Sequence, residues 1–177
     1  MKSKLFPEVF PFTHHFYPLH KYIKEDGAYI NNFLANLSKN KSDETENLIY
    51  IHIPFCHNHC LFCPFHATTD RNSGVVERYV DAVIREIQVY SGFTYIKGMK
   101  INAVYFGGGS PSALPIKEIK KLIDAIVKCF DIASNCEWTF EGEPITLADN
   151  ELMHFLKERN FARISYGIQT FNQSLRE

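Results

Sequence analysis

Two hydrophobic patterns alternate along the chain from about residue 48 onward. Short apolar runs rich in β-forming residues, such as LIYIHI at 48–53 and NAVYF at 102–106, predict strands. Two later runs, EWTFEG at 137–142 and ARISYGI at 162–168, predict two more. Longer stretches of helical period lie between the strands, at 74–90, 115–130 and 147–160. This β-α-β-α-β-α-β order predicts an α/β fold with a parallel sheet covered by helices.

The two longer helical stretches each carry one apolar stripe. Apolar residues recur at three- and four-residue steps, which is the spacing that lays one face of a helix against a sheet. The first stripe consists of Val76, Tyr79, Val80, Val83, Ile84 and Ile87, and the second of Ile119, Leu122, Ile123, Ile126 and Val127. Pro115 stands where the first turn of the second helix tolerates proline.

The pattern also suggests where the folded domain begins and ends. Residues 1–47 show no clear period and end in the polar run SKNKSDETEN, so we interpret them as an N-terminal extension and linker before a domain at 48–177. FNQSLRE at 171–177 resembles the start of a further helix, and the fourth strand would otherwise be a bare sheet edge. We therefore expect the sequence to be truncated, with a C-terminal half missing. A sheet completed by a partner chain is the alternative.

Composition narrows the class of protein. With 45% hydrophobic and 14% aromatic residues among 177, the chain can bury a sizeable core. Its 19 Lys and Arg balance 20 Asp and Glu, so no nucleic-acid or anionic membrane partner is indicated. Prolines and histidines interrupt the N-terminus where a signal peptide would be apolar, and no window approaches a membrane span. We expect a cytoplasmic protein.

Three of the five cysteines are close together in the sequence. Cys56, Cys60 and Cys63 fall within eight positions, whereas Cys129 and Cys136 stand apart. In a reducing cytoplasm this pattern favours a metal or cluster site over a disulfide framework. We expect Cys129, on the apolar face of a helix, and Cys136, just before a strand, to be buried structural thiols.

The C-x-x-x-C-x-x-C segment directly follows the first predicted strand, at the carboxyl edge where ligands bind in such sheets. Three thiolates on one loop can take three corners of a four-iron, four-sulfur (4Fe-4S) cluster and leave the fourth iron open. The alternative is a structural zinc site, with His57, His59 or His66 as a further ligand. Spacing favours the cluster, because a second C-x-x-C is missing, but it leaves zinc open.

Further motifs make this segment recognisable. Together with its lead-in YIHIPFC, the later FGGGSP and the still later YGIQTF, it resembles the radical SAM family of oxygen-independent coproporphyrinogen III oxidase, from about Leu48 to the chain end. The resemblance implies a partial (β/α) barrel and a 4Fe-4S cluster that binds S-adenosylmethionine (SAM). Reductive cleavage of SAM would give a 5′-deoxyadenosyl radical that takes hydrogen from a small-molecule substrate. An electron donor such as flavodoxin or ferredoxin is implied as partner.

The FGGGSP motif follows the second predicted strand. Glycines permit positive φ and close backbone approach, so the N–H groups of Gly107, Gly108 and Gly109 can face the methionyl carboxylate of SAM. Ser110 adds a hydroxyl. Taken without the resemblance, the same glycines also suit an ordinary strand-to-helix turn.

The resemblance carries four more residues to the SAM site. Glu141 ends the predicted strand EWTFEG and Gln169 ends the next strand, and both match SAM-binding positions of the family. Tyr50 and Phe62 match positions that face SAM. Without the resemblance, Glu141 is an ordinary strand-end acid and the two aromatic residues are packing residues. The sequence assigns no catalytic residue.

Two departures from the family affect the expected reaction. The oxidases follow the third cysteine with Gly-Cys, whereas this chain has Pro64 and Phe65. Glu143 precedes Pro144 where many relatives carry Asn or Asp. We therefore expect a non-oxidase relative acting on a conjugated or heteroaromatic substrate, tetrapyrroles included, with methyl transfer ahead of oxidation. A haem chaperone of the same family and a zinc-binding module are the alternatives.

Overall fold

The computed structural model describes residues 27–39, 42, 46–60, 63, 65 and 67–172, with only the backbone at 27–30. The chain divides into two units, Met1–Asn36 and Leu37–Glu177. Helix α1, Gly27–Lys39, begins in the first unit, inside the segment in which we found no clear period and which we interpreted as an extension and linker. Ile30, Phe33 and Leu37 do follow helical spacing, so a short signal was present in the sequence.

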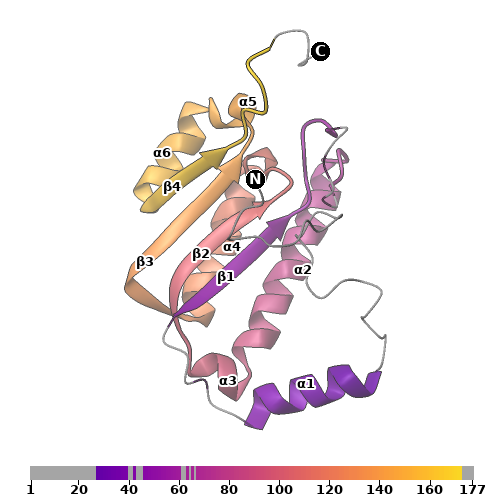
Figure 1. Ribbon diagram of the computed structural model, residues 1–177, viewed down its shortest axis with the longest axis vertical. Coiled ribbons are helices and arrows are strands. Elements are labelled where there is room, and N and C mark those ends of the chain that lie inside the picture. The colour runs from indigo at the N-terminus through magenta and orange to yellow at the C-terminus, as the bar shows by residue number, and fades with distance from the viewer. Residues whose placement is uncertain are drawn as a thin grey trace, which may run out of the picture. The chain divides into compact units, whose positions relative to one another are not determined.

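Four parallel strands form the sheet of the larger unit. They are β1 Asn47–Ile53, β2 Lys100–Gly108, β3 Asp131–Gly142 and β4 Phe161–Tyr166, and they lie side by side in chain order, as Figure 1 shows. The predicted parallel α/β fold is therefore confirmed. β3 begins six residues earlier than the expected start at 137, so Cys136 lies within a strand and not just before one.

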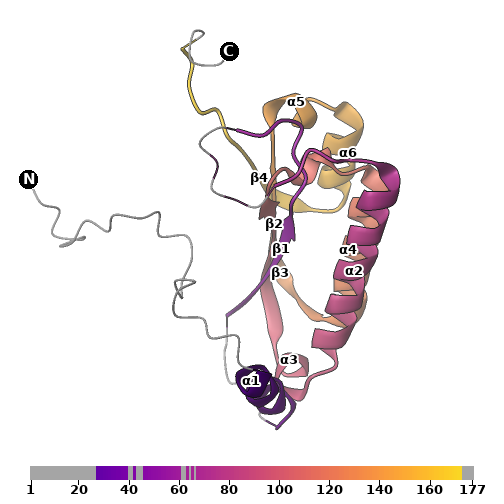
Figure 2. The ribbon, with the colours of Figure 1, turned by 90° about the vertical axis from the view of Figure 1, so that its right-hand side faces the viewer.

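The helices of the larger unit follow the strands in the predicted alternation. The long ones are α2 Ser73–Ser91, α4 Ile116–Cys129 and α6 Asn150–Glu158. Three short helices, which the sequence did not predict, are α3 Thr94–Lys97, the 3-10 helix η2 Pro111–Ala113 and α5 Pro144–Leu147. Figure 2 shows α2, α4 and α6 on one face of the sheet. No helix among the described residues is both long and apolar enough to cross a membrane.

The core lies between the sheet and these helices. Because side chains alternate along a strand, Ile51, Ile53, Val104, Phe106 and Phe140 face the helices and are buried, while the residues between them face the other side. Both apolar stripes reach this core, contributing Val76, Val80 and Ile87 from α2 and Ile119, Leu122, Ile123 and Ile126 from α4. Val127 is an exception, since it is 55% exposed.

Candidate functional site

The carboxyl ends of β1, β2 and β3 bring three loops to one edge of the sheet. Ile53 pairs with Gly108 at the ends of β1 and β2, and Phe106 pairs with Phe140 between β2 and β3. Parallel strands in this register leave the sheet at the same edge. The loop that carries Cys56 therefore starts beside the glycine turn.

The cysteine loop has a fixed base. The Cys56 N–H donates to the Thr68 carbonyl at 3.0 Å, and the Thr68 N–H donates to the Pro54 carbonyl at 2.7 Å. Phe55, which pairs with Thr68, is 1% exposed, and its ring packs edge-on against Tyr79. Backbone bonds and a buried ring thus hold both ends of the loop next to β1.

The three cysteines lie at different depths. Cys56 and Cys63 are half-buried and Cys60 is exposed, and the Cys63 N–H donates to the Cys60 carbonyl at 3.1 Å. Phe62 and His66 lie outside the described residues. Among the residues that the structure does describe, no three His, Cys, Asp or Glu side chains gather as a metal-binding group. Within the described residues, the side chains are therefore not assembled as a ligand set for either a cluster or a zinc ion.

Electrostatics nevertheless link the three thiols. The pKa of Cys56 is raised to about 11, first by burial and then by the Glu143 carboxylate, Cys63 and Cys60, in that order. A negatively charged Cys56 thiolate would be repelled by the Glu143 carboxylate, so without bound metal Cys56 favours its neutral thiol. Bound metal ions would supply the missing positive charge and displace the protons. The donor set therefore suits an iron–sulfur cluster.

The glycine turn allows the loops to approach closely. Gly108 has φ +108°, which confirms the expected positive φ. A Cβ on Gly109 would lie 2.8 Å from Cys56 Sγ and 2.9 Å from the Phe55 carbonyl oxygen, so only glycine fits there. The Gly109 N–H donates to the Ile53 carbonyl at 2.7 Å, so in this structure it joins β1 to the glycine turn, and its contact with SAM stays a prediction.

The Ser110 side chain is buried in a network of its own. Its hydroxyl is completely buried and accepts the Glu143 N–H at 3.1 Å, while the Ser110 N–H donates to the Phe55 carbonyl at 2.7 Å. The Ser112 hydroxyl accepts the same Glu143 N–H at 3.2 Å and is hydrogen-bonded to Thr146. Ser110 therefore connects loops in this structure and does not present its hydroxyl to a ligand.

Glu141 lies beside two tyrosines on the face of the sheet away from α2 and α4. The Tyr105 hydroxyl donates to Glu141 Oε1, and the Tyr50 and Tyr105 rings stack with centroids 5.9 Å apart. Burial first, and then the hydrogen bond to Glu141, raise the pKa of Tyr105 to about 12, so its hydroxyl stays a donor. A Cβ on Gly107 would lie 2.8 Å from Glu141 Oε2.

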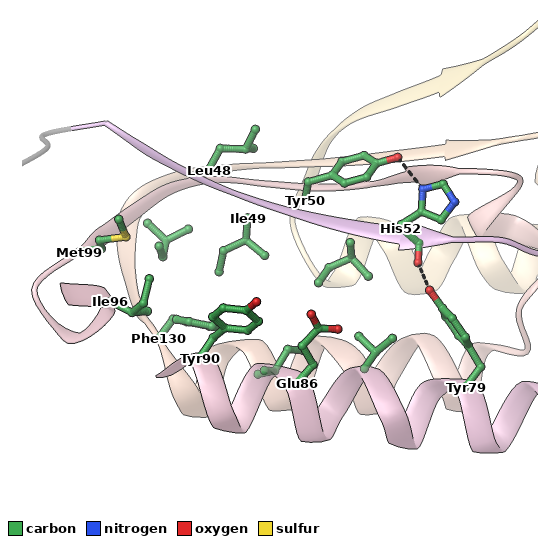
Figure 3. A pocket seen from close by; sticks show the side chains of 14 residues that line it. Leu48, Ile49, Tyr50, His52, Tyr79, Glu86, Tyr90, Ile96, Met99 and Phe130 are labelled. Carbon is green, nitrogen blue, oxygen red and sulfur yellow. Dashed lines mark hydrogen bonds between the residues drawn. The ribbon is translucent and has the colours of Figure 1, made fainter. Parts of the chain in front are cut away.

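Tyr50 also contacts the neighbouring histidine on β1. Its hydroxyl lies 3.2 Å from His52 Nδ1, as the dashed line in Figure 3 shows, and half of Tyr50 is exposed. Burial, followed by the Glu141 carboxylate, raises the pKa of Tyr50. Tyr50, Tyr105, Gly107 and Glu141 together form what we call the tyrosine–glutamate face, which joins two of the expected SAM residues.

Gln169 is not brought to this face. β4 ends at Tyr166, so the expectation that Gln169 ends the strand is wrong, and its side chain is exposed three residues farther on. β3 and β4 are neighbours as expected, with Glu141 paired to Ser165. Gln169 therefore follows the correct strand but lies outside the contacts of Glu141 that the structure describes.

A pocket of about 420 Å³ lies away from the cysteines. It runs between β1 and α2, and Ile49, Val83, Ile87, Ile96 and Met99 are among its mostly apolar lining residues (Figure 3). No cysteine lines it. It reaches the tyrosine–glutamate face only through Tyr50, so the pocket and the candidate site are separate features.

Sequence reasoning missed two residues that organise this site. Tyr105 lies two positions before Gly107 in β2, and strand alternation alone places the two on one face. Glu143 had been noted only as a departure from the family, yet its Oε1 accepts the His57 N–H at 3.0 Å across 86 residues of sequence. The alternation within one strand could have identified Tyr105. Glu143 could not be found from the sequence, because its role depends on which loops meet in the fold.

Comparisons with known proteins agree with this geometry. The family model described as the Radical SAM superfamily matches residues 50–177. Anaerobilin synthase from Escherichia coli O157:H7 is 37% identical over 132 residues, covering 75% of this chain and 29% of that protein. Heme chaperone HemW from Buchnera aphidicola subsp. Schizaphis graminum is 33% identical over 127 residues, covering 72% of this chain and 33% of that protein.

One solved structure has the same fold. The structure of coproporphyrinogen III oxidase (HemN) from Escherichia coli matches with a TM-score of 0.73 and 26% sequence identity, covering 82% of this chain and 32% of that one. The expected barrel-type architecture of parallel strands and outer helices is thereby confirmed. The chain spans about a third of the length of these relatives.

Proposed function

Because this chain belongs to the radical SAM superfamily, we propose that it binds a 4Fe-4S cluster through Cys56, Cys60 and Cys63 and is part of a radical SAM enzyme. The observation that carries the proposal is the position of the cysteine loop, at the carboxyl end of β1 and against Gly109. In a parallel sheet this is the edge where ligands bind. We further propose 48–177 as the domain and 1–47 as its extension.

The cluster and SAM would supply the chemistry when bound, namely one-electron cleavage of the sulfonium to a radical that takes hydrogen from a substrate. This chain would position them. The Cys56–Thr68–Pro54 bonds hold the loop, and the missing side chain at Gly109 lets β2 approach Cys56. An oxygen-sensitive cluster fits a reducing cytoplasm, and a one-electron donor such as flavodoxin or ferredoxin belongs to the same proposal.

The tyrosine–glutamate face would bind SAM. With Oε1 engaged by Tyr105, Glu141 can accept from an ammonium or a ribose hydroxyl through its remaining lone pairs. Tyr50, half exposed, offers a ring and a hydroxyl on the same face. We propose Gly108, Gly109, Phe62 and Gln169 as SAM contacts by family resemblance alone. We now assign Ser110 a supporting role.

The substrate is proposed to be conjugated or heteroaromatic, with tetrapyrroles as the favoured class. Relatives whose names contain heme and coproporphyrinogen support this class. Methyl transfer and oxidation are both compatible with the site. Pro64 and Phe65 stand where the oxidases have Gly-Cys, which argues against oxidation of coproporphyrinogen and leaves methyl transfer ahead of oxidation.

A haem chaperone is the second candidate, since a HemW protein is 33% identical to this chain. The two candidates predict different behaviour. An enzyme turns SAM over to 5′-deoxyadenosine and a modified product, whereas a chaperone binds haem tightly without SAM turnover. A zinc-binding module, the third alternative, would be colourless and free of sulfide.

The test is anaerobic reconstitution followed by iron, sulfide and zinc analysis. We expect a brown protein with close to four irons per chain. One zinc and no acid-labile sulfide would overturn the proposal. Incubation with SAM and dithionite, with 5′-deoxyadenosine measured by chromatography, then separates the enzyme from the chaperone.

A further inference from the structure

Glu143 joins the end of β3 to the cysteine loop. It lies immediately before Pro144, the first residue of α5, and its Oε1 accepts the His57 N–H at 3.0 Å. His57 directly follows Cys56 in the sequence. A carboxylate that accepts a backbone N–H makes a charge-assisted hydrogen bond, which is stronger than the neutral kind. Glu143 therefore fastens the loop one residue away from a proposed cluster ligand.

The Glu143 backbone is itself held from two sides. Its N–H donates to the hydroxyls of Ser110 and Ser112, at 3.1 and 3.2 Å. Its carbonyl accepts the Thr146 hydroxyl at 3.1 Å. A Cβ on the preceding Gly142 would lie 2.3 Å from Ser112 Oγ, so the two loops pack without space for a side chain. These hydrogen bonds fix the position of the Glu143 backbone, and with it the Cα atom from which the side chain extends.

The contact also brings a negative charge to the cysteine loop. The Glu143 carboxylate lies against the backbone of His57, the residue next to Cys56. A Gln in place of Glu143 would keep the acceptor oxygen without that negative charge. The charge of Glu143 can therefore be separated from its hydrogen bond by substitution.

We propose that Glu143 is a positioning residue for the cysteine loop and that its negative charge lowers the reduction potential of the cluster held there. The proposal rests on the proposed function. Reduction adds one electron, and a nearby carboxylate disfavours the added negative charge. A unit charge within about 12 Å, at an effective dielectric constant of about 20, changes such an equilibrium roughly tenfold. For a one-electron couple this equals about 59 mV.

The decisive variant is Glu143→Gln, which keeps the length and the acceptor oxygen but removes the charge. The protein is reconstituted anaerobically, iron and sulfide are assayed, and the midpoint potential is measured by EPR-monitored titration with dithionite and mediators, without SAM. We expect the iron content to stay unchanged. The midpoint potential should rise by about 59 mV, which corresponds to a roughly tenfold change in the reduction equilibrium. Glu158→Gln, which removes an exposed charge at the end of α6, is the matched control and should leave the potential unchanged.

A second variant keeps the proposal testable if Glu143→Gln misfolds. Glu143→Asp retains the charge on a shorter side chain, so it should keep the low potential while lowering iron incorporation. An unchanged potential in Glu143→Gln, or equal shifts in the Gln and Asp variants, would overturn the charge effect. A wild-type protein that binds no iron or sulfide would instead show that the proposed function itself is wrong.

Discussion

Tyr105→Phe removes one oxygen atom from the tyrosine–glutamate face. The ring is retained, so its stacking on Tyr50 at 5.9 Å should persist. What disappears is the hydrogen bond from the Tyr105 hydroxyl to Glu141 Oε1. If Glu141 binds SAM, its carboxylate would lose the donor that holds it in place. The perturbation therefore tests one interaction at little risk to the fold.

The magnitude follows from the kind of bond. A hydrogen bond to a charged group contributes about 1.5–3 kcal/mol, and Glu141 is only half-buried, so the lower end applies. Because this bond is present with and without SAM, only the displacement of Glu141 weakens binding, and we expect SAM affinity to fall by up to about tenfold. Glu141→Ala, which removes the acceptor itself, should lower it about ten- to a hundredfold. In the Glu141→Ala background, Tyr105→Phe should have no further effect, because the two residues act as one unit.

The assay is anaerobic calorimetry with SAM on cluster-loaded protein, with iron measured in parallel. Tyr95→Phe, on α3 beyond the opposite end of the sheet, is the matched control. Because the pKa of Tyr105 is raised to about 12, the donor is intact at neutral pH, and the difference in affinity should hold from about pH 6 to about pH 9. Unchanged affinity in both Tyr105→Phe and Glu141→Ala would remove this face from the SAM site. Additive losses in the double variant would refute the coupling.

Three further changes test the loop and the core. Cys60→Ala should abolish iron and sulfide incorporation, whereas Cys136→Ala in β3 should leave both intact; equal losses by metal assay would contradict the loop assignment. Gly109→Ala forces a Cβ to 2.8 Å from Cys56 Sγ, so iron content should fall and stability should drop by about 1–3 kcal/mol, measured by denaturant unfolding. Phe106→Ala empties a fully buried site and should cost about 3–5 kcal/mol in the same assay, while a loss below about 1 kcal/mol would refute the assigned core.

Periodicity was sufficient to predict the sheet but not all of its boundaries. The alternation of apolar runs predicted all four parallel strands, because a strand buried on one face needs that pattern. The start of β3 was missed since Asp131–Cys136 mixes polar and apolar residues without the alternation expected of a strand. Lys100 pairs with Asp131 there, so backbone pairing with β2 extends the strand beyond its apolar core.

The three cysteines were identified from their spacing, whereas the residues that hold the surrounding loops and Glu141 in place were not. Ser110 was expected to contact a ligand, yet a buried hydroxyl needs a protein partner, and the partner is the Glu143 N–H 33 residues away. The role of Tyr105 depends on Glu141, which lies 36 residues later on the next strand. Contacts of this kind follow from strand register, which a single sequence does not specify.

The contact between His57 and Glu143 orders events during synthesis of the chain. The two residues are 86 positions apart, so the cysteine loop leaves the ribosome well before the residue that fastens it. At about 5–20 residues per second, the delay is roughly 4 to 17 seconds. For that time the nascent thiols stand on a loop without its fastening to β3, open to oxidation or to the wrong metal. On the proposed function, the loop would therefore take up its cluster in the fastened form only after β3 has been made.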